Sequence, residues 1–185
     1  MQAFIDPPKN IPLYLKIGIW ISKIVTGRDL LPGRLLAWYP KAAVSSGIME
    51  SLVAHKDKTL DKRILKLVRL RTSFFVACPF CIDMNSYDYD QFGIKLEEFA
   101  ALQGRIAMEA VKTFSPREVI AMEYAVLISH APLMFGHEFV DKLKSNFNER
   151  EIVILASTVA QVNYWARLLQ ALGVPPAGFS DRCKI

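Results

Sequence analysis

The sequence predicts an all-α protein that folds as one domain. Between corners formed by Pro and Gly, the residues favour helix, and few stretches alternate apolar and polar residues as a strand does. The chain has 185 residues, of which 52% are hydrophobic and 22% are charged. This length fits one domain of roughly 150 residues, and the composition excludes a disordered chain. We therefore expect antiparallel helices with short connections over residues 1–185.

The first expected helix lies in the apolar run of residues 11–25, which Lys16 and Lys23 interrupt. The run is shorter than the roughly 20 clean apolar residues of a membrane span, so no membrane insertion is expected. Four of its apolar residues share one helical face: Leu13, Ile17, Trp20 and Ile24. We expect this face to pack on the rest of the protein, and a contact with another subunit or a membrane surface is the alternative.

The following helices are bounded by corners and caps. We expect two helices, at 34–38 and 42–55, separated by Pro40. The segment 61–75 carries apolar residues at helical spacing, and 95–101 forms a short helix. Ser115 and Glu118 form a capping box, with Pro116 in the first helical position, for a helix that runs to about His130.

The last two expected helices span residues 137–147 and 149–172. Asn148 caps the second of them, and Gly173 ends it. Its first residues faintly resemble residues 62–67, so residues 149–176 are a possible repeat of a helical unit that lies within residues 60–112. Many helices begin with charged residues that are followed by apolar ones, and this common pattern explains the likeness slightly better than a repeat does.

Charge and cysteine content limit the possible functions. The net charge of +5 is modest, and the dense stretch at 56–71 interleaves Lys and Arg with Asp and Leu, as a solvated helix face does. No nucleic-acid partner is therefore expected. Three cysteines exclude a disulfide scaffold, and the first residues lack the features of a signal peptide, so the expected compartment is the reducing cytoplasm.

The chemistry is concentrated in a Cys-x-x-Cys pair, Cys78 and Cys81. On a helix these residues share a face at a separation that a disulfide tolerates. Pro79 predicts that Cys78 is the N-cap and that Cys81 lies in the first turn, where free N–H groups and the helix dipole stabilise a thiolate. Arg69 and Arg71 could add positive charge. Apolar neighbours have the opposite effect, because burial among apolar side chains raises a thiol pKa. These neighbours are Phe74, Phe75, Val76, Phe80 and Ile82.

A zinc site is the rival interpretation, and the ligand set argues against it. A structural zinc ion needs four ligands, and the remaining candidates form no second close pair: Cys183, His55, His130 and His137. No metal or other cofactor is therefore expected. Cys183 is interpreted as a free surface thiol, and His130 as a polar residue at a helix end.

The motif resembles the carboxymuconolactone decarboxylase-like superfamily, and within it the alkylhydroperoxidase D-like proteins. The resemblance rests on residues 70–73, on 78–85 with the sequence Cys-Pro-Phe-Cys-Ile-Asp-Met-Asn, and on Gly93. It implies an all-α fold that forms homo-oligomers such as dimers, trimers or hexamers. It also implies a thiol-dependent hydroperoxide reductase in which Cys81 attacks the peroxide and Cys78 resolves, with a lipoyl-type or thioredoxin-type dithiol as electron donor.

Three positions depart from the pattern of the characterised peroxidases. Lys66 replaces a glutamate, and Phe80 and Asn85 replace two histidines, so the usual proton relay is missing. Supporting roles are expected for Arg71, Ser73, Asp83 and Asn85, and Asp83, Tyr87 or Glu97 could take the place of the base. Two alternatives remain open: a carboxymuconolactone decarboxylase-type lyase and a non-catalytic, oligomeric ligand-binding protein.

Overall fold

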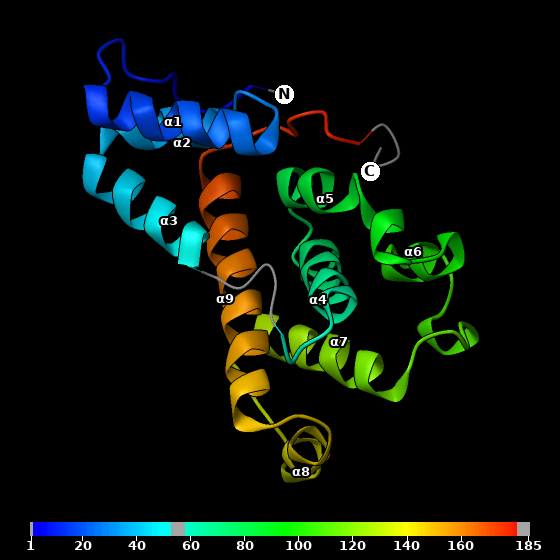
Figure 1. Cartoon of the computed structure of the whole chain (residues 1–185). Coiled ribbons are helices and arrows are strands. Elements are labelled where there is room, and N and C mark those ends of the chain that lie inside the picture. The colour runs from blue at the N-terminus through cyan, green and yellow to red at the C-terminus, as the bar shows by residue number, and fades with distance from the viewer. Residues whose placement is uncertain (1, 53–57, 181–185) are drawn as a thin grey trace.

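The computed structural model describes residues 2–52 and 58–180, and within these ranges it contains helices and no strands (Figure 1). The expected all-α fold is confirmed. The N-terminal part consists of α1 (Leu13–Thr26), α2 (Leu31–Leu35) and α3 (Pro40–Leu52). A 3₁₀ turn, η1 (Leu36–Trp38), joins α2 to α3. The expected break between two helical segments is present at Tyr39, but α3 begins at Pro40 and not at residue 42, because proline is tolerated in a first helical turn. His55 lies outside the described residues.

The central layer is built around α4 (Lys62–Phe75) and α9 (Glu149–Ala171), which cross α7 (Pro116–Ser129). Leucine and valine side chains on α4 are fully buried because other helices cover α4 on several sides. The helix α9 is long and apolar enough to cross a membrane, with a mean hydropathy of 1.3. It packs along its length against α4, α5 and α7, as a core helix does.

The remaining helices surround this layer. They are α5 (Pro79–Ser86), α6 (Leu96–Leu102), α8 (His137–Asn146), η2 (Tyr89–Phe92) and η3 (Met108–Ala110). The expected capping boxes at Ser115 and Asn148 are present, with Ser115 Oγ accepting from the Glu118 N–H and Asn148 Oδ1 from the Glu151 N–H.

One half-buried arginine ties three helices together. Arg63 on α4 donates from Nη2 to Glu98 Oε1 at 2.7 Å and from Nε to Glu118 Oε1 at 2.6 Å. Glu98 and Glu118 each also cap their own helix, by accepting from the N–H groups of Lys95 and Ser115. The charges of two buried carboxylates are therefore compensated by a single guanidinium.

The outer side of α1 departs from expectation. Leu15 is buried, whereas the face that was expected to pack on the protein is exposed to solvent, with Leu13 at 75%, Trp20 at 60% and Ile24 at 61%. The helix is apolar on both sides, so a sequence pattern could not tell which side the domain would cover.

The helices α9 and α4 end in the same Schellman motif, but with different residues in the left-handed conformation. At the end of α9, Gly173 (φ 65°) adopts this conformation, and the Val174 N–H donates to Leu169 O. At the end of α4, Ala77 (φ 49°) does so, and the Cys78 N–H donates to Ser73 O. An alanine there carries a strain that glycine lacks.

The two positions are expected to respond oppositely to substitution. Ala77→Gly should raise the free energy of unfolding by about 1 kcal/mol, since it relieves the left-handed strain. Gly173→Ala should lower it by at least about 1 kcal/mol, because it adds this strain and its Cβ would meet the Phe4 ring at 2.6 Å. Urea unfolding measures both. Gly47→Ala is the control: it lies in α3 with open space around it and should be neutral or stabilising. If Ala77→Gly and Gly173→Ala changed the free energy of unfolding in the same direction and by the same amount, the left-handed conformation assigned to these two positions would be contradicted.

Candidate active site

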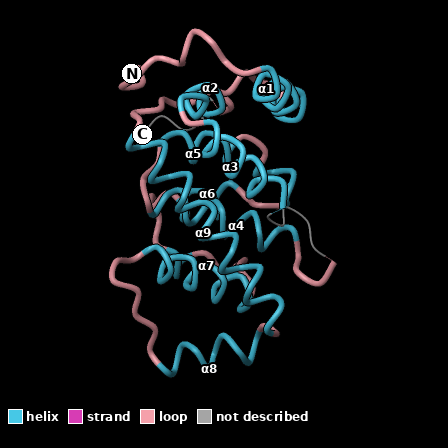
Figure 2. Tube along the Cα trace, turned by 90° about the vertical axis from the view of Figure 1, so that its left-hand side faces the viewer, coloured by secondary structure: helices cyan, strands magenta, loops and turns pink. Residues whose placement is uncertain are grey.

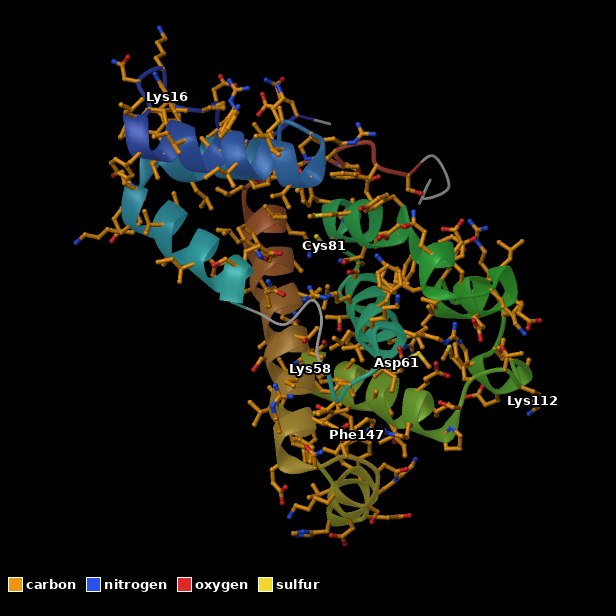
Figure 3. The ribbon with its side chains drawn as sticks, viewed as in Figure 1. Lys16, Lys58, Asp61, Cys81, Lys112 and Phe147 are labelled. Carbon is orange, nitrogen blue, oxygen red and sulfur yellow. The ribbon has the colours of Figure 1, made fainter. Side chains whose placement is uncertain are left out.

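Cys78 connects the end of α4 to the start of α5. As the second residue after the C-cap of α4, it donates its N–H to Ser73 O at 3.3 Å. As the N-cap of α5, it accepts the Cys81 N–H on its Sγ, also at 3.3 Å. The prediction that Cys78 is the N-cap and that Cys81 lies in the first turn is confirmed. Figure 3 shows Cys81 at the end of α5 that faces α4 and α9.

The two cysteines form no disulfide in this structure and are hydrogen-bonded to each other. The side-chain hydrogen bond from Cys81 is the main cause that lowers the pKa of Cys78, and the N–H groups of Cys81 and Phe80 add to it against the effect of burial. The same bond, together with burial, raises the pKa of Cys81. The site thus favours a thiolate on Cys78 and a protonated thiol on Cys81.

The sulfur pair is buried in an apolar cluster. Cys78 is 1% exposed and Cys81 is 5% exposed. They pack with residues of α2, α5 and α9 in one buried cluster, and the partly buried Trp165 lies against it. The other buried members of the cluster are Leu35, Phe80, Ala166, Leu169 and Val174. A ligand can therefore reach the sulfurs only by a local opening of these covering side chains.

Two of the four supporting residues lie together beside the pair. Ser73 is fully buried on α4, and its Oγ donates to Arg69 O and accepts from Asn85 Nδ2 at 3.0 Å. Asn85 lies one helical turn after Cys81 on the same face of α5. Ser73 and Asn85 thus link the two helices that carry the site.

The other two supporting residues have different partners. The Asp83 carboxylate is buried and accepts the N–H groups of Phe179 at 3.1 Å and Ser180 at 2.8 Å, so it fixes the C-terminal segment to α5. Burial lowers the pKa of Arg71, and the nearby charge of Glu109 on η3 opposes that shift. Tyr87 and Glu97 are exposed.

An ion pair occupies the position at which the characterised peroxidases carry the glutamate of their proton relay. Lys66 on α4 is buried and pairs through Nζ with Asp88 Oδ1, while its ammonium lies over the ring of Phe92. Burial lowers the pKa of Lys66, and the hydrogen bond to Asp88 opposes this. The side-chain amine of Lys66 is therefore already paired with the carboxylate of Asp88.

A chain of side-chain hydrogen bonds runs from α4 through α9 to α3, and it was not predicted from the sequence. Arg69 Nη1 donates to Gln161 Oε1 at 3.0 Å, and Gln161 Nε2 donates to Glu50 Oε2. Trp165 Nε1 also donates to Glu50 Oε2, at 2.9 Å. The only sequence signal was the spacing of Lys66, Arg69 and Ser73, which places three polar side chains along one face of a leucine-rich helix.

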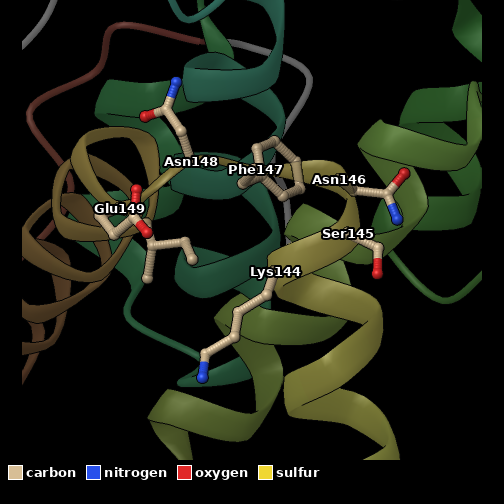
Figure 4. Close-up of a pocket in the computed structure, with 7 residues that line it drawn as sticks. Lys144, Ser145, Asn146, Phe147, Asn148 and Glu149 are labelled. Atoms are coloured by element: carbon tan, nitrogen blue, oxygen red, sulfur yellow. The ribbon is translucent and has the colours of Figure 1, made fainter.

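Two surface hollows lie away from the cysteines. Figure 4 shows one of about 550 Å³ at the turn between α8 and α9, lined by residues 144–149 and Ile152. In Figure 3 its residue Phe147 lies next to α8, well below Cys81 in the view. The other, of about 760 Å³, is lined by residues 5–10 and Trp38. Among the described residues, no group of three or more His, Cys, Asp or Glu side chains could hold a metal ion. Cys183 is outside these residues.

The fold of this chain is similar to that of a known class of solved structures. The chain has the fold of the alkylhydroperoxidase AhpD core, as seen in an uncharacterised peroxidase-related protein from Ralstonia eutropha JMP134, with a TM-score of 0.79 and 15% identity over 94% of this chain and 92% of that one. The debrominase Bmp8, in complex with 2,3,4-tribromopyrrole, has a TM-score of 0.75 and 15% identity over 94% and 91%. The resemblance stated from the motif is thereby confirmed at the level of the fold.

A curated relative extends the likeness to the whole sequence. The uncharacterised protein YnjA of Escherichia coli (strain K12) is 24% identical over 185 residues, which cover 98% of this chain and 96% of YnjA. No family model matches the sequence.

Proposed function

We propose that this protein is a thiol-dependent reductase that transfers two electrons from Cys78 and Cys81 to a small oxidant, an organic hydroperoxide in the first instance. The observation that carries the proposal is the position of Cys78 Sγ at the start of α5, where it accepts the Cys81 N–H. The N-terminal end of a helix stabilises a thiolate, and the thiolate is the nucleophile.

The proposed reaction uses both sulfurs. The Cys78 thiolate attacks the terminal peroxide oxygen, the O–O bond breaks, and Cys78 becomes a sulfenic acid while an alkoxide leaves. Cys81 gives its proton to the alkoxide, which departs as the alcohol. The resulting Cys81 thiolate attacks the sulfenic sulfur, releases hydroxide and forms the Cys78–Cys81 disulfide. An external dithiol of the lipoyl or thioredoxin type, in a reducing cytoplasm, restores the two thiols.

In this order of events Cys81 is the proton donor. It takes the role of the proton relay that the characterised peroxidases have and this chain lacks. The hydrogen bond to Cys78, together with burial, raises the pKa of Cys81, so its thiol holds a proton next to the attacking sulfur. Lys66 and Asp88 are paired with each other, and Asp83 is engaged by two backbone N–H groups. The reverse order, implied by the resemblance, in which Cys81 attacks, stays a prediction.

Reductive dehalogenation is a second candidate. The similarity to the debrominase Bmp8 covers 94% of this chain, and the apolar cluster around the sulfurs suits an aromatic substrate better than a polar one. The same dithiol would supply the two electrons.

The test is intact-protein mass analysis after less than one equivalent of cumene hydroperoxide. We expect a loss of two hydrogens, a Cys78–Cys81 cross-link in the peptide map, and continuous peroxide consumption when a dithiol is supplied. The variant Cys183→Ser should behave like the wild type and excludes the third cysteine as the source. A protein that consumes no peroxide in a cysteine-dependent manner contradicts the peroxidase; debromination of a bromopyrrole by that protein would establish the second candidate.

A further inference from the structure

The outer face of α1 is an exposed apolar surface. Seven apolar residues of this helix are between 50% and 78% exposed. They occupy one continuous arc on the side of α1 opposite the buried Leu15: Leu13, Tyr14, Ile17, Trp20, Ile21, Ile24 and Val25. We call these seven residues the outer α1 face. Figures 1 and 2 both show α1 at the edge of the molecule, next to α2.

The composition of this face is that of the core of a protein interface. It contains no charged residue, and the two lysines of the helix, Lys16 and Lys23, lie together along one edge of the arc. Interface cores are depleted in charge and enriched in Trp and Tyr, and the outer α1 face has one of each. A helix that is apolar on both sides is normally covered on both sides.

The area of the face matches one side of a stable dimer. With about 150–250 Å² for each large side chain, the exposed fractions amount to roughly 800 Å². A standard interface buries about 800 Å² per partner, whereas the largest apolar patch on a typical monomer covers roughly 300–600 Å².

We propose that the outer α1 face is the surface on which a second copy of this chain docks, with α1 packed against α1 of the partner. A two-fold contact uses the same patch on both copies, and Trp20 lies at the middle of α1, close to where the axis would pass.

A second copy fits the charges better than a membrane surface does. A helix that lies on a membrane carries Lys and Arg along a polar face opposite its apolar one. Here the side opposite the outer α1 face is packed against the protein and includes Leu15, and the lysines flank only one edge.

Sedimentation velocity of the full-length protein tests the proposal. The wild type should sediment as a dimer or a larger oligomer, and Trp20→Glu should weaken association by at least about 30-fold and give species of 20.9 kDa. Leu96→Glu is the matched control, because Leu96 on α6 is 70% exposed but lies on another helix; it should leave association unchanged. The alkylation rate of Cys78 reports that the Trp20→Glu monomer is folded.

Three outcomes would overturn the proposal. One is a wild-type protein that remains monomeric at 100 µM or about that concentration, well above ordinary dimer dissociation constants. The second is an oligomer that Trp20→Glu and Ile24→Glu both leave intact. The third is a monomer that binds phosphatidylglycerol vesicles through Trp20, which would assign the face to a membrane instead.

Discussion

Cys78→Ser is expected to reduce the rate of thiol alkylation at pH 7 by at least about 100-fold, because it removes the only sulfur that the site stabilises as a thiolate. Cys81→Ser should still be alkylated, at Cys78. After one equivalent of hydroperoxide, Cys81→Ser should stop at a sulfenic acid on Cys78, which dimedone traps, because no resolving thiol is present. Stopped-flow alkylation with iodoacetamide and mass analysis measure the two effects, both in a Cys183→Ser background.

The pH profiles of the two variants give an independent readout. The pKa of Cys78 is lowered, so the alkylation midpoint of wild-type Cys78 should lie below the ordinary thiol value of about 8.5. The main cause is the hydrogen bond from the Cys81 thiol, so Cys81→Ser should keep part of this shift through the serine hydroxyl and the N–H groups. A lower midpoint for Cys81 than for Cys78, with the sulfenic acid on Cys81, would reverse the proposed roles and support the order that the resemblance implies.

Arg63→Leu is expected to destabilise the fold by about 3–5 kcal/mol, since it leaves two buried carboxylates without their shared cation. Glu98 is fully buried and Glu118 is 6% exposed, and each holds the first turn of its own helix. Urea unfolding measures the loss. Lys142→Leu is the control, because Lys142 pairs with Glu123 at an exposed site and should cost less than about 1 kcal/mol. A similar cost for both variants would show that the Arg63 network contributes no more than a surface pair.

The same network predicts an acid-dependent loss of stability. Burial acts to raise the pKa of Glu98, but hydrogen bonds from Arg63, Thr113 and the Lys95 N–H together lower it. A carboxyl with a lowered pKa stabilises the folded state above the pKa of the unfolded chain, which is about 4.3 for Glu. This contribution is lost as the pH falls from there through the folded pKa, and the loss should be smaller in Glu98→Gln.

The helices and caps could be predicted because each is encoded locally. Ser115 and Asn148 each stand three residues before a Glu, and Pro79 follows a cysteine, so one short window contains the whole signal. Ser73 and Asn85 were identified from the motif and do meet in space. These interactions depend on neighbours in sequence or on a motif that joins two adjacent helices.

The parts that sequence reasoning missed depend on distant segments. The contacts of Gln161 with Arg69 and Glu50 join residues 92 and 111 positions apart, and Asp83 meets Phe179 across 96 positions. The pairing of Lys66 with Asp88 was also missed, because a lysine and an aspartate 22 positions apart have no local spacing rule. For α1, the apolar pattern was correct, but it could not show which side would stay uncovered.

Because Cys78 Sγ serves as the cap of α5, the folding of this helix and the proposed electron transfer would depend on the same atom. Any free energy by which the helix start favours the reduced thiolate must be given up when the sulfur is oxidised. The reduced form is thus the one that the protein scaffold stabilises, and a dithiol stabilised in this way forms a disulfide with a higher reduction potential. In the proposed function, the position of one sulfur atom would thereby favour the passage of electrons from a dithiol donor to this protein.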